Sequence, residues 1–424
     1  ENFREFFPEK VRKILKTVSS VSQVLKYSTY LVGGIVRDTL LKIPNFDIDI
    51  VVEGDGIKFG KELSKRLKCR LECHQKFGTS VLVLSDGQHI DIATARVEYY
   101  KSPAALPSVE SGNIKQDLSR RDFTINTMAI SLNRESFGEL LDYFGGREDL
   151  KSKKIKVLHK MSFIEDPTRI FRAVRFEKRL GFKMDSQTEK LARTTINMNI
   201  VSRLNGVRIR DELIYILNEE NPLEAVRRLY ELDALKKIGI EVKVDDKFMK
   251  KVKKILKYYG EMEAYFDEIG REIKKWRLLF IILLKGIKPD RIERWCSEMK
   301  VKKKDIYIIL GTYKMWNETK RNLKNIIKKN STLYHRVNSI PPELQVIASS
   351  WGREYFRNIK KFLTELSTLH LEIDGNTLKN MGYKPSEKFR DVLGKLFKMK
   401  LDGKITSKKD EISNLKKLMG ARCG

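Results

Sequence analysis

Cysteine and histidine are scarce in this chain of 424 residues. There are four cysteines and five histidines, and the cluster Cys69, Cys73, His74 has no second Cys/His pair beside it. A structural zinc site is therefore not expected, and His-Asp phosphohydrolase chemistry is unlikely because no histidine stands in a His-Asp pair. So few cysteines suit reduced thiols, as in a cytosol, and we expect a cytoplasmic protein.

Long apolar runs are also missing. The longest, residues 278–284, is too short to cross a bilayer and predicts a core helix. No signal-peptide pattern opens the chain, so we expect no membrane association. The chain starts at Glu1 without a methionine, as expected of a fragment of a longer protein. No pattern identifies a protein partner.

Acidic residues are outnumbered by basic ones. The chain has 85 Lys+Arg against 56 Asp+Glu, a net charge of +29. Such an excess favours a polyanionic partner, above all a nucleic acid. The alternative, a lysine-rich thermophile surface, would bring a matching number of acids. Several lysine-rich stretches suit contacts with RNA phosphates: 247–257, 300–304 and 320–329.

The apolar periodicity changes once along the chain. Up to about residue 145 it predicts one helix within 1–30, another at 57–67, and several strands. From about 155 onward it is helical throughout. The sequence therefore predicts an α+β protein, a small mixed head followed by an all-helical remainder. The expected strands are 30–32, 47–52, 80–84 and 89–94.

The segment 31–54 carries the first chemical signal. It places Gly33, Gly34 and Arg37 shortly before a strand that bears Asp47 and Asp49. Residues two apart in a strand share a face, so the two carboxylates lie about 7 Å apart, close enough to hold a pair of hard cations. Glycines let the backbone approach a phosphate. Each feature alone suits a plain turn or a solvated face, but together they favour a nucleotidyl-transfer site.

A second cluster lies in residues 117–130, where Arg121, Asp122 and Asn126 stand close together. An arginine fork can bind triphosphate oxygens bidentately, and the neighbouring acid can accept a hydrogen bond from a ribose hydroxyl. A surface ion pair is the ordinary alternative for such neighbours. We therefore expect nucleotide binding here only in combination with the first cluster.

The two clusters resemble one family. Gly-Gly-x-x-Arg-Asp-x-Leu-Leu followed by Asp-x-Asp is similar to the first motif of class II tRNA nucleotidyltransferases and bacterial poly(A) polymerases, in the DNA polymerase β superfamily. Residues 120–129 resemble that family's Arg-Arg-Asp-Phe-Thr-Ile-Asn-Ala-Met-Ala motif, with Thr127 in place of alanine. The resemblance implies a mixed-sheet, polymerase β-like head and an all-α neck, body and tail. We expect these parts at 1–146, 147–215, 216–340 and 341–424.

The segment 163–176 predicts a helix that starts at Asp166 and Pro167. Arg169, Arg172 and Arg175 recur every three residues along it, a pattern that also suits a solvated basic face. The segment resembles the family's Glu-Asp-x-x-Arg motif, a protein template for the incoming base. A carboxylate can accept from the exocyclic amine of cytosine or adenine, and uracil and guanine present a carbonyl instead. Asp166 and Arg169 are thus expected to read C and A.

Other positions carry weaker signals. Residues 206–213 resemble the last neck motif, with Val207 in place of an acid, and we expect Arg208 and Glu212 to brace the neck helix. Asp91 alternates onto the face of the metal acids and is a candidate third carboxylate, although a solvated strand residue fits nearly as well. Residues 97–116 are expected to form a loop that in the family helps the switch to adding A.

These signals predict a template-independent tRNA 3′-end nucleotidyltransferase that builds part or all of the CCA terminus. Mg²⁺ is the expected cofactor, CTP and/or ATP the nucleotide, and the acceptor and T arms of tRNA the partner. The alternatives are a poly(A) polymerase and a catalytically inactive RNA-binding protein on the same scaffold. The expected catalytic residues are Asp47, Asp49 and Asp91, with Asp47 and Asp49 as metal ligands; the expected nucleotide-binding residues are Gly33, Gly34, Arg37, Arg121, Asp122, Asn126, Asp166, Arg169, Arg172 and Arg175.

Overall fold

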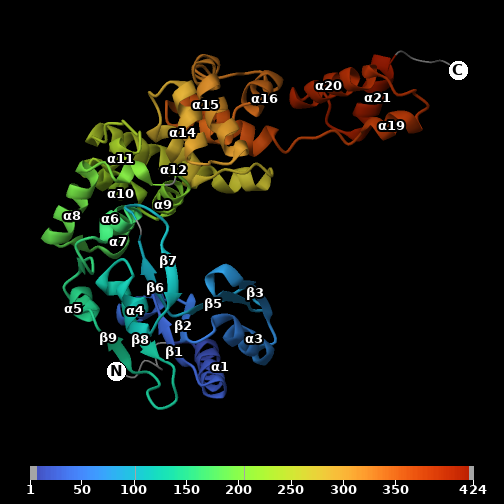
Figure 1. The fold of residues 1–424 in the computed structure, drawn as a ribbon. Coiled ribbons are helices and arrows are strands. Elements are labelled where there is room, and N and C mark those ends of the chain that lie inside the picture. The colour runs from blue at the N-terminus through green and yellow to red at the C-terminus, as the bar shows by residue number, and fades with distance from the viewer. Residues whose placement is uncertain (1–6, 101, 205, 420–424) are drawn as a thin grey trace. The chain divides into compact units, whose positions relative to one another are not determined.

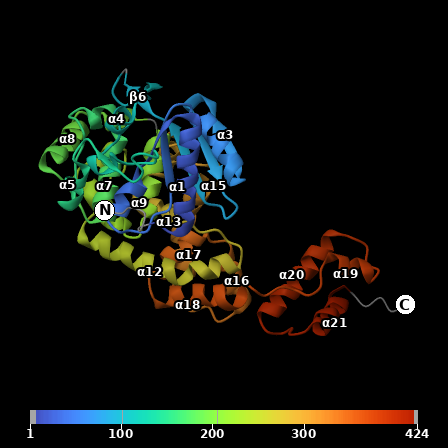
Figure 2. The ribbon, with the colours of Figure 1, turned by 90° about the horizontal axis from the view of Figure 1, so that it is seen from below.

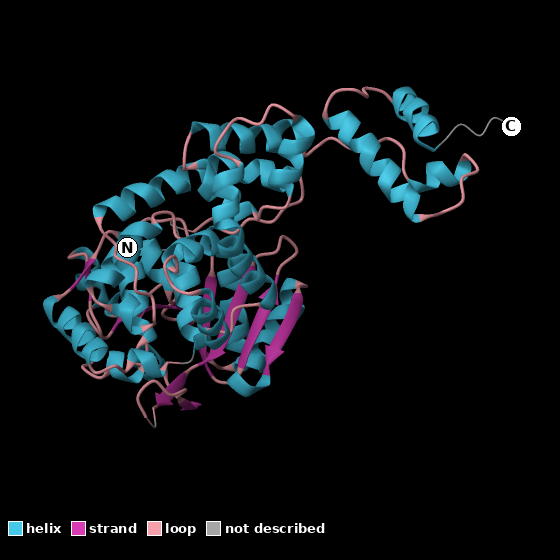
Figure 3. Cartoon of the chain, turned by 90° about the horizontal axis from the view of Figure 1, so that it is seen from above, coloured by secondary structure: helices cyan, strands magenta, loops and turns pink. Residues whose placement is uncertain are grey.

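The chain folds into two compact units, Glu1–Ile238 and Gly239–Gly424. The structure, a computed structural model, describes residues 7–100, 102–204 and 206–419 (Figure 1). Within these residues the named strands all lie in the first unit, and the second consists of helices and loops (Figure 3). No helix in the described part of the chain is long and apolar enough to span a bilayer. The α+β architecture predicted from the periodicity is confirmed.

A mixed sheet forms the core of the first unit. Its strands lie in the order β3-β4-β5-β2-β1-β8-β9. β2 and β5 run parallel and the other neighbours antiparallel. The strands are β1 (Ser28–Val32), β2 (Ile48–Glu53), β3 (Arg70–His74), β4 (Thr79–Val83), β5 (His89–Thr94), β8 (Met128–Ser131) and β9 (Leu140–Asp142).

Helices cover the two faces of this sheet unequally. α1 (Glu9–Leu25) and α3 (Gly56–Leu67) pack together along one face, over Ile48 and Ile50 of β2, which are about 1% exposed. α4 (Ile114–Ser119) covers part of the other face, around the buried Val51. Apolar residues thus occupy both faces of β2, and the acids remain only near its first residues.

The sequence missed several strands of this unit. β8 and β9 are short, and β8 is buried along its whole length, so it shows no polar alternation. β3 has no fully buried residue, so it lacks the apolar face that marks a strand. The expected loop at 97–116 is largely wrong. It contains the hairpin of β6 (Arg96–Tyr99) and β7 (Ser108–Ser111), followed by α4, because the partly buried β6 and the exposed β7 pair in antiparallel register.

Helices build the rest of the first unit. α7 begins at Thr168, directly after Pro167, where Asp166 accepts hydrogen bonds from the backbone N–H and hydroxyl of Thr168. α9 packs along α7. The elements are α2 (Gly34–Leu40), α5 (Gly146–Lys151), α6 (Ser162–Glu165), α7 (Thr168–Leu180), α8 (Ser186–Asn197), α9 (Gly206–Asn218), α10 (Pro222–Glu231) and α11 (Ala234–Lys237), with the short strands β10 (Lys154–Ile155) and β11 (Lys183–Met184).

The second unit is helical throughout its described residues. α12, α17 and α18 pack side by side (Figure 2), and the fully buried Arg277 of α13 joins Glu343 and Asp305 from two other helices. The expected division of the chain into head, neck, body and tail stays a prediction, because the structure separates into two compact units only. The helices are α12 (Asp246–Glu268), α13 (Lys275–Leu283), α14 (Pro289–Glu298), α15 (Lys303–Asn322), α16 (Asn330–Asn338), α17 (Pro342–Ser349), α18 (Arg353–Lys361), α19 (Gly375–Asn380), α20 (Glu387–Leu401) and α21 (Lys408–Met419).

Candidate active site

Three carboxylates gather at the start of β2. Asp49 on β2 is the direct neighbour of Asp91 on the parallel strand β5, so both point to the same face. Asp47 immediately precedes β2. Burial and the charges of Asp91 and Asp47 raise the pKa of Asp49 to about 6, although Arg121 opposes the rise. The three acids therefore repel one another, and a bound cation would relieve that repulsion.

The donor set fits magnesium. In residues 7–100, 102–204 and 206–419, no three His, Cys, Asp or Glu side chains are close enough to form a complete metal site. Mg²⁺ does not need one, because it keeps several waters and is usually held by one or two carboxylates together with substrate phosphates. Asp47 and Asp49 line the same cavity and suit this arrangement.

Gly33 lies against this acidic group. Its φ is +80°, a conformation that side-chain-bearing residues rarely adopt, and it directly precedes α2. A Cβ added here would stand 2.9 Å from Oδ2 of Asp49. Glycine at this position therefore serves both the turn and the placement of the Asp49 carboxylate.

Gly33→Ala should lower nucleotide incorporation, by roughly 10- to 100-fold, because the Cβ displaces Asp49 and this sparsely populated backbone conformation costs about 1–3 kcal/mol. Single-turnover assays would measure the loss. Gly87→Ala is the matched control, since Gly87 also has a positive φ (+83°) but a Cβ there would meet no atom within 4 Å. Equal losses in the two variants would mean that backbone strain alone, not the Asp49 contact, explains the effect.

A continuous polar chain joins α2, the 3₁₀ turn Thr124–Asn126 and the helices α7 and α9. Arg37 donates to Asn126 (2.8 Å), Asn126 donates to Asp122 (2.9 Å), and Arg172 donates to both Asp122 (2.8 Å) and Glu212 (3.4 Å). Burial alone would raise the pKa of Asp122. Hydrogen bonds from Asn126 and Arg172, and the arginine's charge, hold it below its usual value instead. The side chain of Asp122, expected at a ribose, is thus bonded to the protein on both oxygens.

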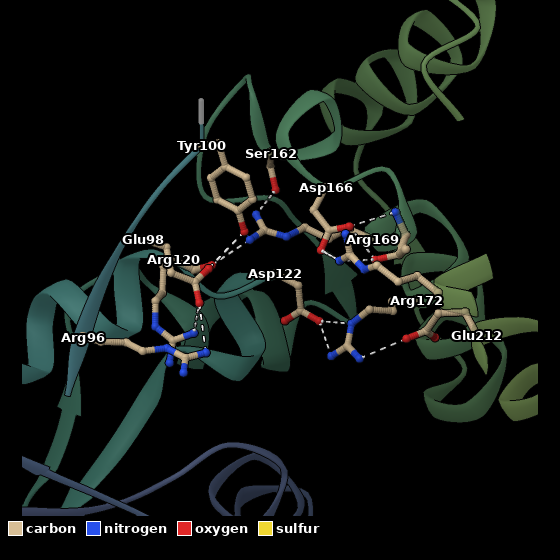
Figure 4. A network of polar contacts seen from close by, with 12 residues as sticks. Arg96, Glu98, Tyr100, Arg120, Asp122, Ser162, Asp166, Arg169, Arg172 and Glu212 are labelled. Carbon is tan, nitrogen blue, oxygen red and sulfur yellow. Dashed lines mark hydrogen bonds and ion pairs between the residues drawn. The ribbon is translucent and has the colours of Figure 1, made fainter. Parts of the chain in front are cut away.

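The two residues expected to read the base are also held by the protein (Figure 4). Asp166 accepts from Arg208 of α9 (2.6 Å) as well as from Thr168. Arg169, only 5% exposed, donates to the hydroxyl of Ser162 (2.7 Å) and to the backbone carbonyl of Arg120 (2.7 Å). Their carboxylate and guanidinium groups therefore have fixed orientations.

Arg120 links this pair to the β6–β7 hairpin. Its guanidinium donates to Glu98 of β6 (2.8 Å) and to the buried Asp117 (2.7 Å), and Glu98 also accepts from the hydroxyl of Tyr100 (3.0 Å). Burial, and next the charge of Glu98, raise the pKa of Tyr100, so the phenol stays protonated. The hairpin thus supports the carbonyl that holds Arg169 (Figure 4).

One polar cavity of about 570 Å³ brings these groups together. Among the described residues that line it are eight arginines and five carboxylates. Asp91 is the one predicted site residue that does not line the cavity. It acts on the site through its charge, which raises the pKa of Asp49. The predicted residues at the wall are Gly33, Gly34, Arg37, Asp47, Asp49, Arg121, Asp122, Asn126, Asp166, Arg169, Arg172 and Arg175.

Comparison with known proteins agrees with this geometry. The model of the "Poly A polymerase head domain" matches residues 29–156, and that of the "Probable RNA and SrmB- binding site of polymerase A" matches residues 181–242. A solved structure of a CCA-adding enzyme, apo form II, superposes with a TM-score of 0.79 at 33% identity, over 97% of this chain and 96% of that one. The chain belongs to the class II tRNA nucleotidyltransferase family.

Two further members of the tRNA nucleotidyltransferase family are similar to the chain over nearly its whole length. The Thermotoga maritima CCA-adding enzyme, solved in complex with tRNA, is 31% identical with a TM-score of 0.73, over 99% of this chain and 98% of that one. The A-adding tRNA nucleotidyltransferase of Geobacter sulfurreducens is 35% identical over 96% of this chain. The match covers 47% of the Geobacter protein, so the present chain spans about half of that relative's length.

Sequence reasoning missed part of this nucleotidyltransferase site. Glu98, Tyr100, Arg179 and Phe176 also line the cavity, as does Arg120, which the sequence marks only as the first residue of a motif. Phe176 lies under the guanidinium groups of three arginines, at 5.0–5.7 Å from its ring centre. Its position directly after the arginine ladder was the only available signal, because its partner arginines come from two different helices.

Proposed function

We propose that this chain transfers nucleotides from CTP and/or ATP to the 3′ end of tRNA, without a nucleic-acid template. The observation that carries the proposal is the single cavity in which two metal-binding acids, an arginine cluster and the pair Asp166 and Arg169 meet. Family membership and the likeness to enzymes of tRNA end processing support it. The free thiols of Cys69 and Cys73 fit the cytoplasmic location that we also propose.

Asp47 and Asp49 would hold Mg²⁺ in this reaction. Bound magnesium would lower the pKa of the attacking ribose hydroxyl and stabilise charge on the α-phosphoryl group and on pyrophosphate. Asp91 is the register neighbour of Asp49 on the parallel strand β5, and burial raises the pKa of Asp91. We propose Asp91 as the group that accepts the proton of this hydroxyl.

Arg121 and Arg175 are the best candidates to bind the triphosphate. The Nε atoms of both are buried and have no hydrogen-bond partner within the described part of the chain. Arg37, in contrast, gives its Nε to Asp38 (2.7 Å) and one terminal nitrogen to Asn126. We propose that Arg37 orients the wall of the site, while Arg121 and Arg175 contribute free donors to phosphate oxygens.

Asp166 and Arg169 would select the base. The Asp166 carboxylate can accept from the amino group of cytosine or adenine while Arg208 holds its other side, and Arg169 can donate to the neighbouring ring nitrogen. Uracil and guanine would place a carbonyl oxygen against the carboxylate. The fixed orientation of both side chains makes this discrimination possible without a template strand.

Asp166→Ala should reduce the preference for CTP and ATP over UTP and GTP by roughly 5- to 150-fold, the worth of one bidentate contact of about 1–3 kcal/mol. The measurement is kcat/KM for each nucleotide on tRNA ending at the discriminator base, at one C and at two C. Asp211→Ala is the matched control, because Asp211 lies on α9, pairs with the adjacent Arg210 and is not among the described residues that line the cavity. An unchanged preference in Asp166→Ala would contradict the assignment.

Addition of A alone is the second candidate, favoured by the name of the Geobacter relative. The same three tRNAs separate the possibilities. C, C and then A would identify a complete CCA enzyme, two C additions a CC-adding one, and A only on the two-C substrate an A-adding one. A long A ladder would identify a poly(A) polymerase, and no incorporation would leave only RNA binding.

A further inference from the structure

An aromatic cluster in the second unit carries a lysine on its surface. Trp316 of α15 stacks on Tyr313 (ring centres 6.4 Å apart, 17° between planes) and packs against Trp351 (5.4 Å). Nζ of Lys285, just after α13, lies 4.3 Å from the centre of the Trp316 ring. A cation over the face of an indole is attracted by the ring quadrupole, so the ring favours this position of the ammonium group.

Two more lysines lie beside it. Lys320 follows Trp316 by one helical turn on α15, and Lys251 comes from α12. Partial burial and the charges of Lys251 and Lys320 lower the pKa of Lys285 to about 8. Within residues 239–419, none of the three lysines forms an ion pair, and no acidic charge offsets the lowered pKa of Lys285.

The cation–π contact alone does not account for this arrangement. Lys285 alone covers the face of the Trp316 ring. The positive charges of the two neighbouring lysines repel it, which is unfavourable unless an anion binds among the three ammonium groups. Lys274 gives the contrast within the same unit. It lies 6.0 Å from the Trp276 ring, and two carboxylates, Glu272 (3.3 Å) and Asp305 (3.5 Å), neutralise it. The group around Lys285 has the aromatic support without the acids.

We propose that Lys251, Lys285 and Lys320, supported by Trp316, form a phosphate-binding site for the RNA backbone. The proposal rests on the proposed function, because the RNA is the tRNA substrate. Three ammonium groups act as point charges toward the oxygens of a phosphodiester and release its counterions. The stacked rings keep water from one side of Lys285, which strengthens the attraction to the phosphate.

Lys285→Met tests the site in the full chain. We expect tRNA to bind about 3- to 10-fold more weakly at 0.1 M salt, and the slope of log K against log[salt] to fall by about one. Lys253→Met is the matched control, since Lys253 is also exposed on α12 but lies on another side of the helix, about 200° around the axis from Lys251. It should keep the wild-type slope. An unchanged slope in Lys285→Met would overturn the proposal.

Titration with inorganic phosphate separates RNA from a free anion. Tryptophan emission in the wild type should change only at high phosphate concentration, and the change should be absent in Lys285→Met. Saturation at micromolar phosphate together with an unaltered tRNA slope would overturn the assignment to RNA. If the wild type extends tRNA while Lys285→Met binds it like the wild type, only this inference fails. If the wild type extends no tRNA, the proposed function itself fails.

Discussion

Asp49→Asn should abolish nucleotide incorporation, with a loss of at least about a thousandfold in kcat/KM. The substitution keeps the size of the side chain, so Gly33 still fits against it, but it removes the negative charge that would hold a metal ion. Metal stabilisation of the transition state contributes several kcal/mol, and about 4 kcal/mol corresponds to three orders of magnitude. Incorporation of labelled CTP and ATP into tRNA in the presence of Mg²⁺ measures the loss.

The matched control for Asp49→Asn is Asp86→Asn. Asp86 lies in the turn between β4 and β5, half-exposed and paired with Lys10, so the same chemical change is made in the same sheet away from the cavity. Both variants should bind tRNA with the wild-type salt dependence, because neither changes a basic residue. Incorporation by Asp49→Asn near the wild-type rate would refute the assignment of Asp49 as a metal-binding, catalytic residue.

The placement of the acids was accessible from the sequence. The period of two along residues 47–52 puts Asp47 and Asp49 on the face opposite Ile48 and Ile50, and both isoleucines are indeed buried. The pairing of Asp49 with Asp91 was foreseeable only as a shared face. Their direct register depends on the parallel pairing of β2 with β5, which the intervening α3, β3 and β4 make possible and no local pattern encodes.

The partners of the arginines could not be foreseen. Spacing identified Arg169 and Arg172 as one ladder, but the structure gives them different surroundings. Arg169 is buried against Ser162 and the carbonyl of Arg120, while Arg172 bonds to Asp122, fifty positions earlier in the chain. Such contacts arise from the packing of α7 against segments distant in sequence. A motif indicates which residues belong to the site, but not which partners they bond or which of their donors remain free.

Asp122→Asn should destabilise the first unit by about 3 kcal/mol. The carboxylate is buried and holds the charge of Arg172, and removal of one partner from a buried ion pair costs about 3–5 kcal/mol because the other charge stays unpaired. We expect the lower end of this range, since a third of the Arg172 side chain is exposed and Glu212 remains as a second acceptor. Urea unfolding followed by circular dichroism at pH 7 measures the difference.

The pH dependence of this difference gives a second check. The pKa of Asp122 is lower in the folded chain than the unfolded value of about 3.9, so its stabilising effect is complete above that value and is lost as the pH falls through the folded pKa. The gap between wild type and Asp122→Asn should therefore narrow below about pH 4. A difference in unfolding free energy that stays constant with pH would mean that the asparagine destabilises the chain through its shape or hydrogen bonding and not through the lost charge.

Tryptophan fluorescence supplies the internal control for Asp122→Asn. All four tryptophans, Trp276, Trp295, Trp316 and Trp351, lie in the second unit, so their emission follows that unit alone. The transition seen by circular dichroism should shift in the variant because the first unit loses its ion pair, while the fluorescence transition should keep its midpoint. Equal shifts in both signals would contradict a local effect. The two units would then unfold cooperatively, and the charge on Asp122 would affect the stability of the whole chain.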